Sequence, residues 1–419
     1  SLMIKYLFIS NILLIFTFNL SFANDLAFAR DKLERITQKF ELEISEGNMP
    51  GAVILIAKNN NIIYHDAIGY LNKEKSIPMQ KDAIFRAFSM TKPLVSVLTL
   101  IMMEEGLLQL ADPIDKYLPS LNNFFLYDAQ NENNKKKLTK PITIYDLLRH
   151  TSGITYASRS PEIKKFYEKA NLYSKTIPFK SMKISPKKQI KGFSKIPLLF
   201  EPGTQWQYGL STDLLGRVLE VIDNKSLAEI LKERLLDKLE MSDTTFLIPQ
   251  KNHSRIAEPL KINKKTGKPT IQLIDLTEKL ANDSGGAGIA TTSSDYYNFC
   301  SMLLNNGIFK DKTILSRSSV KLMTSDHLNF QVKQKIQPGE LLFGSKGYTF
   351  GLGVMVRKDN GFALVPGSKG EFSWAGYAGT FFWVDPQEEL IGILMSQTPG
   401  KIRQYYRRLI KQMTYQALK

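Results

Sequence analysis

Cysteine and histidine are scarce in this sequence of 419 residues, which has one cysteine and four histidines. A single thiol, Cys300, excludes an internal disulfide framework. Because Cys300 lies in an apolar stretch with helical spacing, we expect a buried structural thiol rather than a nucleophile. No two histidines stand at metal-ligand spacing, so no metal site is predicted. The four are His65, His150, His253 and His327.

Several motifs that identify large enzyme classes are absent. The sequence has no Gly-x-Ser-x-Gly segment, which argues against an α/β-hydrolase. It has no Walker or dinucleotide-binding glycine motif, so no cofactor is predicted. His150 stands next to Thr151-Ser152-Gly153 and is expected to be a structural turn residue. With 43% hydrophobic and 11% aromatic residues, the chain can still bury a large core.

Long apolar runs are also scarce, and one near the start carries a targeting pattern. Lys5 supplies a positive charge, residues 7–18 are mostly apolar, and Ser21-Phe22-Ala23 offers small residues at the −3 and −1 positions. This pattern predicts a cleavable signal peptide over residues 1–23. The run is shorter than the roughly 20 residues of a spanning helix, although an uncleaved N-terminal anchor is the alternative. After cleavage we expect an exported protein, periplasmic or secreted, without an integral membrane span.

Acidic residues are outnumbered, with 40 Asp and Glu against 56 Lys and Arg and a net charge of +16. Much of the excess lies between Lys135 and Lys195, where basic residues alternate with Pro, Ser and Asn. Because this alternation does not follow a nucleic-acid-binding motif, no nucleic-acid partner is predicted. It favours a solvated basic surface, which we expect to associate with anionic envelope polymers.

Apolar periodicity predicts helices and strands at both ends of the chain. Residues 25–47 have helical spacing, and residues 52–57 and 62–67 are β-rich segments joined by a turn at Asn59-Asn60-Asn61. A buried helix is expected over residues 91–105. Further strands are expected in the last third, before a final helix at 402–418. These strands are 352–357, 362–365, 380–384 and 390–396.

The order of these elements predicts an α/β (α+β) fold. Residues 24–111 and 281–419 are expected to form one domain, an antiparallel sheet built from both ends of the chain and flanked by helices. Residues 112–280 are expected to form an inserted all-helical subdomain. It includes a Lys-rich insertion at about 158–197.

Ser89-Met90-Thr91-Lys92 is the first segment that carries chemistry. A serine hydroxyl is a weak nucleophile until a base takes its proton. Residues three apart share one face of a helix, so the Lys92 amine can reach the Ser89 oxygen. Burial lowers the pKa of an amine, which would let Lys92 act as that base.

The same serine-lysine spacing recurs at Ser185/Lys188 and Ser318/Lys321. Ser185 precedes a proline inside a Lys-rich loop, and Ser318 stands in a polar helix start that capping explains. Ser89 instead precedes the apolar residues 93–98, which must be buried. A polar pair at the mouth of a buried helix indicates function rather than structure alone.

Phe88-Ser89-Met90-Thr91-Lys92-Pro93 resembles the nucleophile motif of the serine β-lactamase and penicillin-binding-protein superfamily. Other blocks resemble its class C-type branch, which includes esterases and D-aminopeptidases, and they keep the family's order over most of residues 45–400. These blocks are 112–119, 143–153, 201–204 with Tyr208, and 285–292. The resemblance implies a β-lactamase/transpeptidase-like fold, a covalent acyl-enzyme on Ser89 and no cofactor.

Tyr208 stands where this family places the tyrosine of its Tyr-x-Asn or Tyr-Ser motif. The resemblance implies that the phenol relays a proton, first as a general base and then as an acid. The alternative is a core tyrosine with a satisfied hydroxyl. Leu210 occupies the position of the lactamase asparagine, so an amide contact to substrate is missing. Asp213 is expected to be a structural residue at a helix start.

Trp374-Ala375-Gly376 stands at the position of the family's Lys-Thr-Gly strand. The resemblance implies that the small Ala375 and Gly376 let the strand approach an acyl group. It also implies that the backbone N–H groups of Ser89 and Tyr377 form the oxyanion hole. The absent lysine normally helps to hold a β-lactam carboxylate, so Trp374 resembles the esterases of this branch. The alternative is a tryptophan that only packs.

Three functions remain open on these residues. The first choice is an exported carboxylesterase that acts on a small-molecule ester through an acyl-enzyme on Ser89. The second is a β-lactamase or a D-amino-acid peptidase, which acts on amides of cell-wall type. The third is a non-catalytic envelope protein that binds cell-wall peptides, and the intact Ser89, Lys92 and Tyr208 argue against it.

Overall fold

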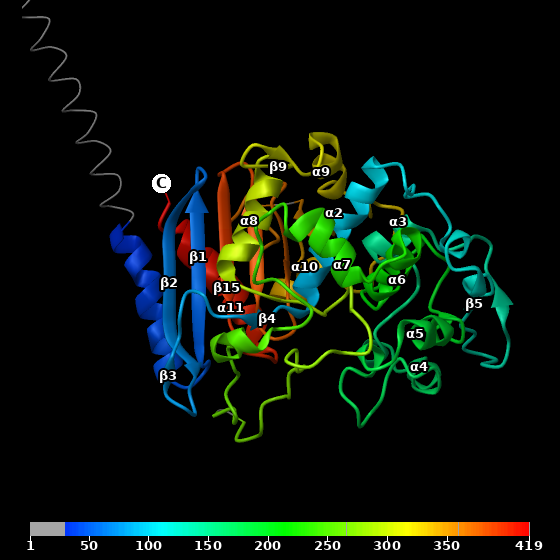
Figure 1. Ribbon diagram of the computed structural model, residues 1–419, viewed down its shortest axis with the longest axis horizontal. Helices are drawn as coiled ribbons and strands as arrows, with labels where there is room; N and C mark the ends of the chain where they lie inside the picture. The colour runs from blue at the N-terminus through cyan, green and yellow to red at the C-terminus, as the bar shows by residue number, and fades with distance from the viewer. Residues whose placement is uncertain (1–29, 265, 359, 419) are drawn as a thin grey trace, which may run out of the picture.

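The computed structural model describes residues 30–264, 266–358 and 360–418 (Figure 1). The signal peptide predicted over residues 1–23 lies outside these ranges. A helix runs over residues 30–45 of the described part, within the segment predicted to be helical. Across the three described ranges, no helix is both long and apolar enough to cross a membrane.

The centre of the fold is an eight-stranded antiparallel sheet in the order β11-β12-β13-β14-β15-β1-β2-β3. Strands from the first and last parts of the chain meet where β1 pairs with β15, with Val53 opposite Met395. The strands are β1 (Gly51–Lys58), β2 (Asn61–Asn72), β3 (Ile77–Pro78), β11 (Tyr348–Phe350), β12 (Met355–Arg357), β13 (Phe372–Ala375), β14 (Phe381–Asp385) and β15 (Leu390–Met395). This topology confirms the predicted antiparallel sheet built from both ends of the chain.

The hairpin between β1 and β2 follows from its turn residues. Asn59 and Asn60 have φ angles of 52° and 62°, and asparagine tolerates this left-handed region better than most residues. Positive φ at both central positions gives a turn whose twist matches that of the flanking strands. The turn predicted at these asparagines is therefore observed.

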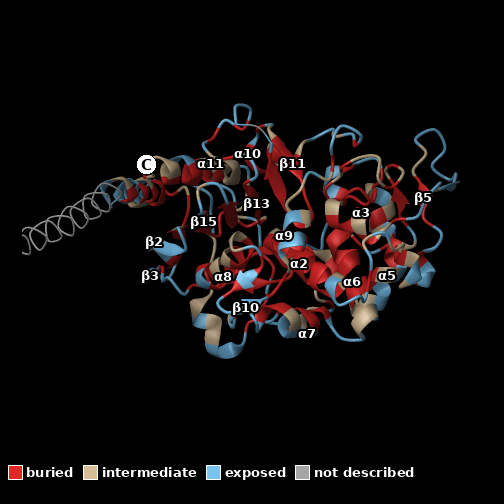
Figure 2. Ribbon diagram, turned by 90° about the horizontal axis from the view of Figure 1, so that it is seen from above, coloured by how far each residue is buried: buried red, intermediate tan, exposed pale blue. Residues whose placement is uncertain are grey.

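Helices cover both faces of the sheet (Figure 2). On one face the helix over residues 30–45 packs beside α11 (Ile402–Tyr415), where the rings of Phe40 and Tyr406 lie 6.1 Å apart. On the other face α8 (Ser293–Leu304) lies against β14, β15 and β1. Because both faces are covered, every residue of β1 except the last is buried.

Cys300 lies in α8 and is buried, as the sequence predicts. Burial raises the pKa of its thiol well above the ordinary value. A thiol that stays protonated is a poor nucleophile. Cys300 therefore fills space in the core beside the sheet.

The region between the two halves of the sheet is mostly helix and loop. Its helices are α3 (Ile144–Arg149), α4 (Lys164–Lys169), α5 (Pro186–Phe193), α6 (Ser211–Asp223) and α7 (Leu227–Leu231), which continues as a π-helical turn at Lys232–Leu236. Although this region was expected to be all-helical, it also holds the small sheet β6-β5-β7. Its strands are Lys136–Lys137, Phe125–Leu126 and Pro197–Leu198. Strands of two residues are too short to leave a periodic pattern in the sequence. The domain boundaries at 111 and 281 stay a prediction.

Shorter elements connect these layers. α2 (Thr91–Glu104) is the buried helix predicted after Ser89. The strand before the Ser89 turn, β4 (Phe85–Arg86), pairs with β8 (Ala290–Thr291), which follows the helical region in the chain. The others are β9 (Ile308–Phe309), β10 (Lys312–Thr313), α9 (Arg317–Met323) and α10 (Pro338–Phe343), with 3-10 turns at Phe88–Met90, Ile114–Lys116, Pro119–Leu121, Ala157–Arg159, Lys180–Met182 and Gln250–Arg255.

The strand predicted over residues 362–365 is wrong, because these residues form a turn. Leu364 adopts a left-handed φ of 58°, which a strand cannot contain. The side chains of Phe362 and Leu364 are 69% and 76% exposed. The apolar run is therefore a turn that exposes these two side chains, although Ala363 and Val365 are buried.

Candidate active site

Ser89 lies in a tight turn between β4 and α2. The 3-10 turn Phe88–Met90 runs directly into the helix, so Lys92 follows on its first turn. Phe88 has a φ of 45°, a strained value for an aromatic residue. Its ring packs at 5.4 Å from the rings of both Phe179 and Tyr377, contacts that offset this strain. The packed turn fixes the position of Ser89.

Lys92 is fully buried at 0% exposure. Its Nζ lies 3.3 Å from Ser89 Oγ, 2.7 Å from Tyr156 Oη and 3.0 Å from the Gly286 carbonyl oxygen. It also lies 4.6 Å from the centre of the Tyr208 ring. The geometry expected from the serine-lysine spacing is therefore present, and the amine is held by oxygens that carry no full charge.

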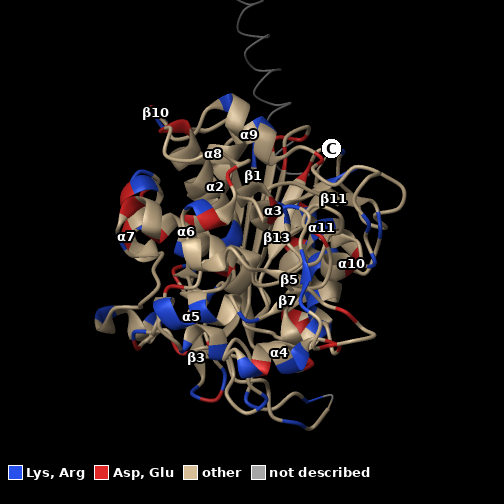
Figure 3. Ribbon diagram, turned by 90° about the vertical axis from the view of Figure 1, so that its right-hand side faces the viewer, with Lys and Arg blue, Asp and Glu red and all other residues tan. Residues whose placement is uncertain are grey.

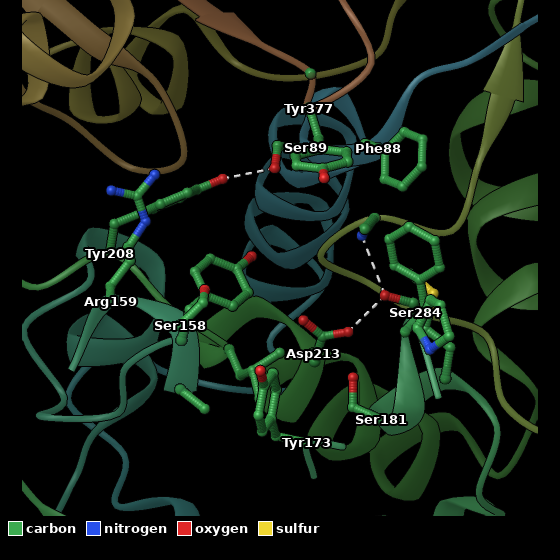
Figure 4. Close-up of a pocket in the computed structure, with 18 of the residues that line it drawn as sticks. Phe88, Ser89, Ser158, Arg159, Tyr173, Ser181, Tyr208, Asp213, Ser284 and Tyr377 are labelled. Atoms are coloured by element: carbon green, nitrogen blue, oxygen red, sulfur yellow. Dashed lines mark hydrogen bonds between the residues drawn. The ribbon is translucent and has the colours of Figure 1, made fainter. Parts of the chain in front are cut away.

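Tyr208 reaches Ser89 from the opposite side of the cleft, where its hydroxyl donates to Ser89 Oγ at 2.7 Å (Figure 4). The indole N–H of Trp374 in turn donates to Tyr208 Oη at 3.3 Å. Burial alone raises the pKa of Tyr208, but the Lys92 charge and the hydrogen bonds at the hydroxyl outweigh it and leave the pKa below its ordinary value. The phenol is thus prepared to lose a proton.

Tyr156 completes this cluster, and the sequence analysis missed it. Its hydroxyl accepts the 2.7 Å hydrogen bond from Lys92, and its ring packs edge-on against Tyr208 at 5.2 Å. Burial first, and then the neighbouring Tyr208, raise the pKa of Tyr156 well above its ordinary value. Lys92 therefore contacts two tyrosines whose pKa values are shifted in opposite directions. The one sequence signal was that Tyr156 closely follows the block at 143–153.

Strand β13 brings the other predicted substrate-binding residues to the cleft. Trp374 is 1% exposed, and its ring packs at 5.1 Å from Tyr208 while also lining the cavity. Packing and contact with the cavity are thus combined in one side chain. Gly376 approaches the nucleophile turn so closely that a Cβ there would lie 2.4 Å from the Ala87 carbonyl oxygen. Together with Ala375, this glycine allows the strand to meet the turn.

The peptide between Gly376 and Tyr377 has a defined orientation. Arg407 donates to the Gly376 carbonyl oxygen at 3.2 Å, and Arg403 donates to that of Tyr377 at 2.8 Å. A trans peptide points its N–H opposite to its carbonyl, so the Tyr377 N–H points away from Arg407. Within the described chain, no protein acceptor takes this N–H.

These groups border a cavity of about 450 Å³ with walls from both parts of the chain. Tyr173 and Phe179 come from the helical region, and Trp374 and Tyr377 come from the sheet side. The cationic side chains that line the cavity are Arg159, Lys180, Arg403 and Arg407. Burial, with the adjacent Arg403, lowers the pKa of Arg407 to about 9. Positive charge is therefore present at this cavity even though position 374 holds a tryptophan and not the lysine of the lactamases.

Three other residues lie near the cluster. Leu210 is buried and lines the cavity. Asp213 lies in the first turn of α6 as predicted, and its carboxylate accepts from Ser284 Oγ at 2.5 Å (Figure 4). His150 ends α3 with a φ of 58°, as a turn residue, and its ring packs at 5.0 Å from Tyr208. Burial first, and then Lys92, hold the pKa of His150 well below its ordinary value.

The two competing serine-lysine pairs have structural explanations. Ser185 is the N-cap of α5 and accepts from the Lys188 N–H at 3.2 Å, so the loop expected here is a helix start. Ser318 is exposed within α9, whose cap is Ser316. Neither Ser185 nor Ser318 lines the cavity. Ser89 therefore differs from both by its place in a cleft.

Comparison with known proteins shows the family to which the chain belongs. The chain matches the beta-lactamase family over residues 30–413 and belongs to that family. It is 29% identical over 368 residues to Protein Rv1367c of Mycobacterium tuberculosis, which covers 84% of this chain and 86% of the relative. It is 24% identical over 379 residues to Esterase EstB of Burkholderia gladioli, which covers 87% of this chain and 90% of that esterase.

Solved structures share the fold. EstCE1, a hydrolase with promiscuous acyltransferase activity, superimposes with a TM-score of 0.76 and 24% identity over 93% of this chain and 99% of its own. Simvastatin synthase (LovD) from Aspergillus terreus superimposes with a TM-score of 0.71 and 21% identity over 92% and 99%. The predicted β-lactamase/transpeptidase-like fold and family are thus confirmed. The chain is a serine hydrolase of the β-lactamase fold, with esterases and acyltransferases among its relatives.

Proposed function

We propose that this protein is an exported carboxylesterase that forms an acyl-enzyme on Ser89. The observation that carries the proposal is the position of Ser89 Oγ, within 2.7 Å of Tyr208 Oη and 3.3 Å of Lys92 Nζ at the edge of a cavity. A hydroxyl between a phenol with a lowered pKa and a buried amine is an activated nucleophile.

The first half-reaction uses Tyr208 as the proton acceptor. The serine-lysine spacing assigns a base role to Lys92, and the family resemblance assigns one to Tyr208. The shorter contact and the lowered pKa favour the phenolate of Tyr208. As Ser89 attacks the ester carbonyl, its proton passes to Tyr208, which then protonates the departing alkoxide. Lys92 supplies the positive charge that stabilises the phenolate. The backbone N–H groups of Ser89 and Tyr377 hold the oxyanion.

The second half-reaction replaces the alcohol by water. Tyr208 takes a proton from the water as it attacks the acyl carbon, and the proton returns to Ser89 Oγ as the acyl bond breaks. The acid leaves and the resting cluster is restored. Each step therefore needs one group that shuttles a proton and one fixed charge beside it.

Esters are favoured over amides for two reasons. Trp374 and Leu210 stand where the lactamases have a lysine and an asparagine, so contacts to a β-lactam are missing. The cavity wall is also rich in aromatic rings, including Tyr173, Phe179 and Tyr377, which suits an apolar acyl or alcohol group. These features support an ester as the small-molecule substrate over a cell-wall amide.

Acyl transfer is a second candidate activity, supported by a second cavity of about 340 Å³. Tyr208, Arg159 and Leu341 line both cavities. An alcohol in the second cavity would reach Tyr208 and could lose its proton there in place of water. Addition of a simple alcohol during ester turnover should then yield a new ester, measured by mass spectrometry. Unchanged yields of free acid at every alcohol concentration would exclude transfer.

The direct test of the proposed function is Ser89→Ala, with Ser318→Ala as the matched control. We expect Ser89→Ala to lower kcat/KM for a p-nitrophenyl ester by about 10⁴-fold or more, since an essential member of the catalytic unit is lost. The control should leave turnover unchanged. A fluorophosphonate should add one adduct, on Ser89. Near-normal turnover by folded Ser89→Ala protein, or an adduct on Ser185 or Ser318, would overturn the assignment.

Export rests on the pattern in residues 1–23 alone. We infer that the mature chain begins near Asn24 and lies outside the cytoplasm. N-terminal sequencing of the protein from its host tests this, because an intact Met3 on cytoplasmic protein would contradict it.

A further inference from the structure

Positive charge is concentrated in one part of the chain. Residues 135–195 contain 14 lysines and two arginines but three acidic residues, so they carry most of the net charge of +16. Figure 3 shows this charge on α4 and α5. The catalytic proposal above makes no use of these lysines.

The lysines in α5 and just before it are free to meet a partner. Lys183, Lys187, Lys188 and Lys191 are exposed. Within the described ranges, none of these four amines lies within ion-pair distance of a carboxylate. Their charge is therefore balanced by solvent ions, which a polyanionic surface would release on binding.

Buried contacts fix the backbone under these lysines. Met182 and Ile184 are buried, and the side chain of Asn282 donates to the carbonyl oxygens of Ser181 and Ile184 at 2.8 Å each. Gln189 also donates to the Ser181 carbonyl oxygen, at 3.1 Å. The lysines are thus displayed on an anchored segment rather than on a loose loop.

Exposed apolar side chains stand at the edge of the active-site cavity on the same segment. Ile177 is 41% exposed and lines the cavity, and so does Ile271, which is 53% exposed and comes from a distant part of the chain. Pro178 lies beside Ile177 and is also exposed. Isoleucines from two loops expose apolar surface to water at one rim of the cavity. Such exposure is unfavourable unless a binding partner covers this surface.

We propose that this rim, formed by Ile177 and Ile271 with the lysines of residues 183–191, docks on an anionic lipid bilayer. Lysines attract the acidic headgroups, and the isoleucines enter the boundary between headgroups and acyl chains. A soluble polyanion would match the lysines but would leave the isoleucines in water. Because both isoleucines line the cavity, docking turns its mouth towards the bilayer and makes an amphipathic ester the substrate class. That last step rests on the proposed function, whereas the docking does not.

Vesicle binding tests the proposal, using the protein as it accumulates in its host so that all variants share one N-terminus. Vesicles of phosphatidylcholine with about 30% phosphatidylglycerol provide the anionic surface, and pure phosphatidylcholine is the neutral comparison. The test variant is K183Q/K187Q/K188Q. The matched control is K312Q/R317Q/K321Q, which removes equal charge from β10 and α9, elements that lie away from α5 (Figure 3). Ile177→Ser, which does not change the charge, tests the apolar part, and melting temperatures verify folding.

We expect the native chain and the control to bind the anionic vesicles tightly and the neutral ones weakly. Three lysines near an anionic surface contribute enough that the test variant should bind roughly 10- to 100-fold more weakly. Ile177→Ser should weaken vesicle binding but leave binding to polyphosphate unchanged, because it removes apolar surface without changing the charge. Ser89→Ala should bind as the native chain does, so failure of the catalytic proposal would leave docking intact.

Other outcomes overturn docking on a bilayer. Equal loss in the test and control variants would mean that net charge alone acts. Full vesicle binding by Ile177→Ser, with polyphosphate bound as tightly as vesicles, would replace the bilayer by a soluble anionic polymer. Equal binding of the native chain to neutral and anionic vesicles would remove the role of the lysines.

Discussion

Two regions of this protein bury the same three residue types in different surroundings. In the cleft, Lys92 lies 4.6 Å from the ring of Tyr208, which accepts a hydrogen bond from the indole of Trp374. Between α11 and the sheet, Lys411 lies 5.6 Å from the ring of Tyr415, which accepts from the indole of Trp383 at 3.2 Å. Lys92 and Lys411 are 0% and 1% exposed.

The two lysines differ in whether a carboxylate contacts them. Lys411 is hydrogen-bonded to Glu371, which also pairs with Arg357 at 2.9 Å. The hydroxyl of Tyr415 donates to Asp385 at 2.7 Å. In the cleft, the contacts of Lys92 are with hydroxyl and carbonyl oxygens. A buried lysine that is paired with a carboxylate stabilises the local structure. A buried lysine that contacts uncharged oxygens instead lowers the pKa of a neighbouring phenol.

The two tyrosines respond in opposite directions. Burial first, and then the charges of Glu371 and Asp385, raise the pKa of Tyr415 far above its ordinary value. The pKa of Tyr208 lies below its ordinary value, because the Lys92 charge and hydrogen bonds outweigh burial. The same pair of residue types is therefore inert in one region and prepared for proton transfer in the other.

Replacing each lysine gives the largest contrast. We expect Lys92→Met to lower kcat/KM for a p-nitrophenyl ester by about 10⁴-fold. Its melting temperature should be unchanged or higher, because the contacts of this buried amine within the described residues are with uncharged oxygens rather than with a carboxylate. Lys411→Met should lower the free energy of unfolding by about 3–5 kcal/mol, since Glu371 loses a partner. Activity per folded molecule should survive in Lys411→Met. Equal losses of activity in the two folded variants would break the comparison.

Removing each tyrosine hydroxyl gives the next effect. Tyr208→Phe should cost about 10²- to 10⁴-fold in kcat, the usual contribution of general acid-base catalysis. Tyr415→Phe should cost about 1–3 kcal/mol of stability, because Asp385 loses a buried hydrogen bond. Urea unfolding and steady-state kinetics on both variants measure this. If Tyr208→Phe kept full activity, the proton would have to pass through Lys92 directly.

A substrate comparison tests whether a cation of the cavity can hold a carboxylate in place of the lysine that is absent from position 374. Of the four cationic side chains that line the cavity, Arg403 and Arg407 donate to backbone carbonyl oxygens, which leaves Arg159 and Lys180 to hold a carboxylate. The lysine absent from position 374 would contribute a charge-assisted hydrogen bond of about 1.5–3 kcal/mol. Unless Arg159 or Lys180 replaces that contact, nitrocefin should trail a short p-nitrophenyl ester by roughly 10- to 100-fold in kcat/KM. Each value must first be divided by its uncatalysed rate. A lead for nitrocefin after that correction would favour a β-lactamase.

The sequence predicted the parts of the fold and of this site that depend on local spacing. Ser89 and Lys92 are three residues apart, and the asparagine turn between β1 and β2 uses adjacent residues, so neither needs knowledge of the fold. Tyr208 was found through a family motif. Its contact with Ser89 joins residues 119 positions apart, which no periodicity reveals.

The features that the sequence did not predict depend on tertiary packing or on a missed local signal. Tyr156 belongs to the cluster because its chain segment packs against that of Tyr208, where a Cβ on Gly209 would lie 2.5 Å from the backbone of Thr155. The helix start at Ser185 was a local signal, a serine cap before a proline, that the charge of the segment obscured. The turn at residues 362–365 was mistaken for a strand because apolar side chains do not reveal their exposure.

The smallest effect concerns the indole of each region. Trp374→Phe removes a donor to Tyr208 Oη, so the pKa of Tyr208 should rise. Because the proposed base is the phenolate, kcat/KM should increase with pH as Tyr208 loses its proton, with a midpoint below its ordinary value of about 10. In Trp374→Phe this midpoint should move to higher pH. A neutral hydrogen bond contributes about 0.5–1.5 kcal/mol, so the rate near pH 7 should fall by roughly 2- to 10-fold.

Trp383→Phe is the matched control, because it removes the same donor from Tyr415 without touching the cleft. Its pH profile should overlay that of the native protein, while its melting temperature falls. Rates for both variants from about pH 6 to 10 decide the matter, with KM recorded separately because Trp374 also lines the cavity. An unmoved midpoint in Trp374→Phe would mean that a group other than Tyr208 sets the profile. A midpoint that moved equally in Trp383→Phe would mean that the two regions are coupled, and the contrast between them would fail.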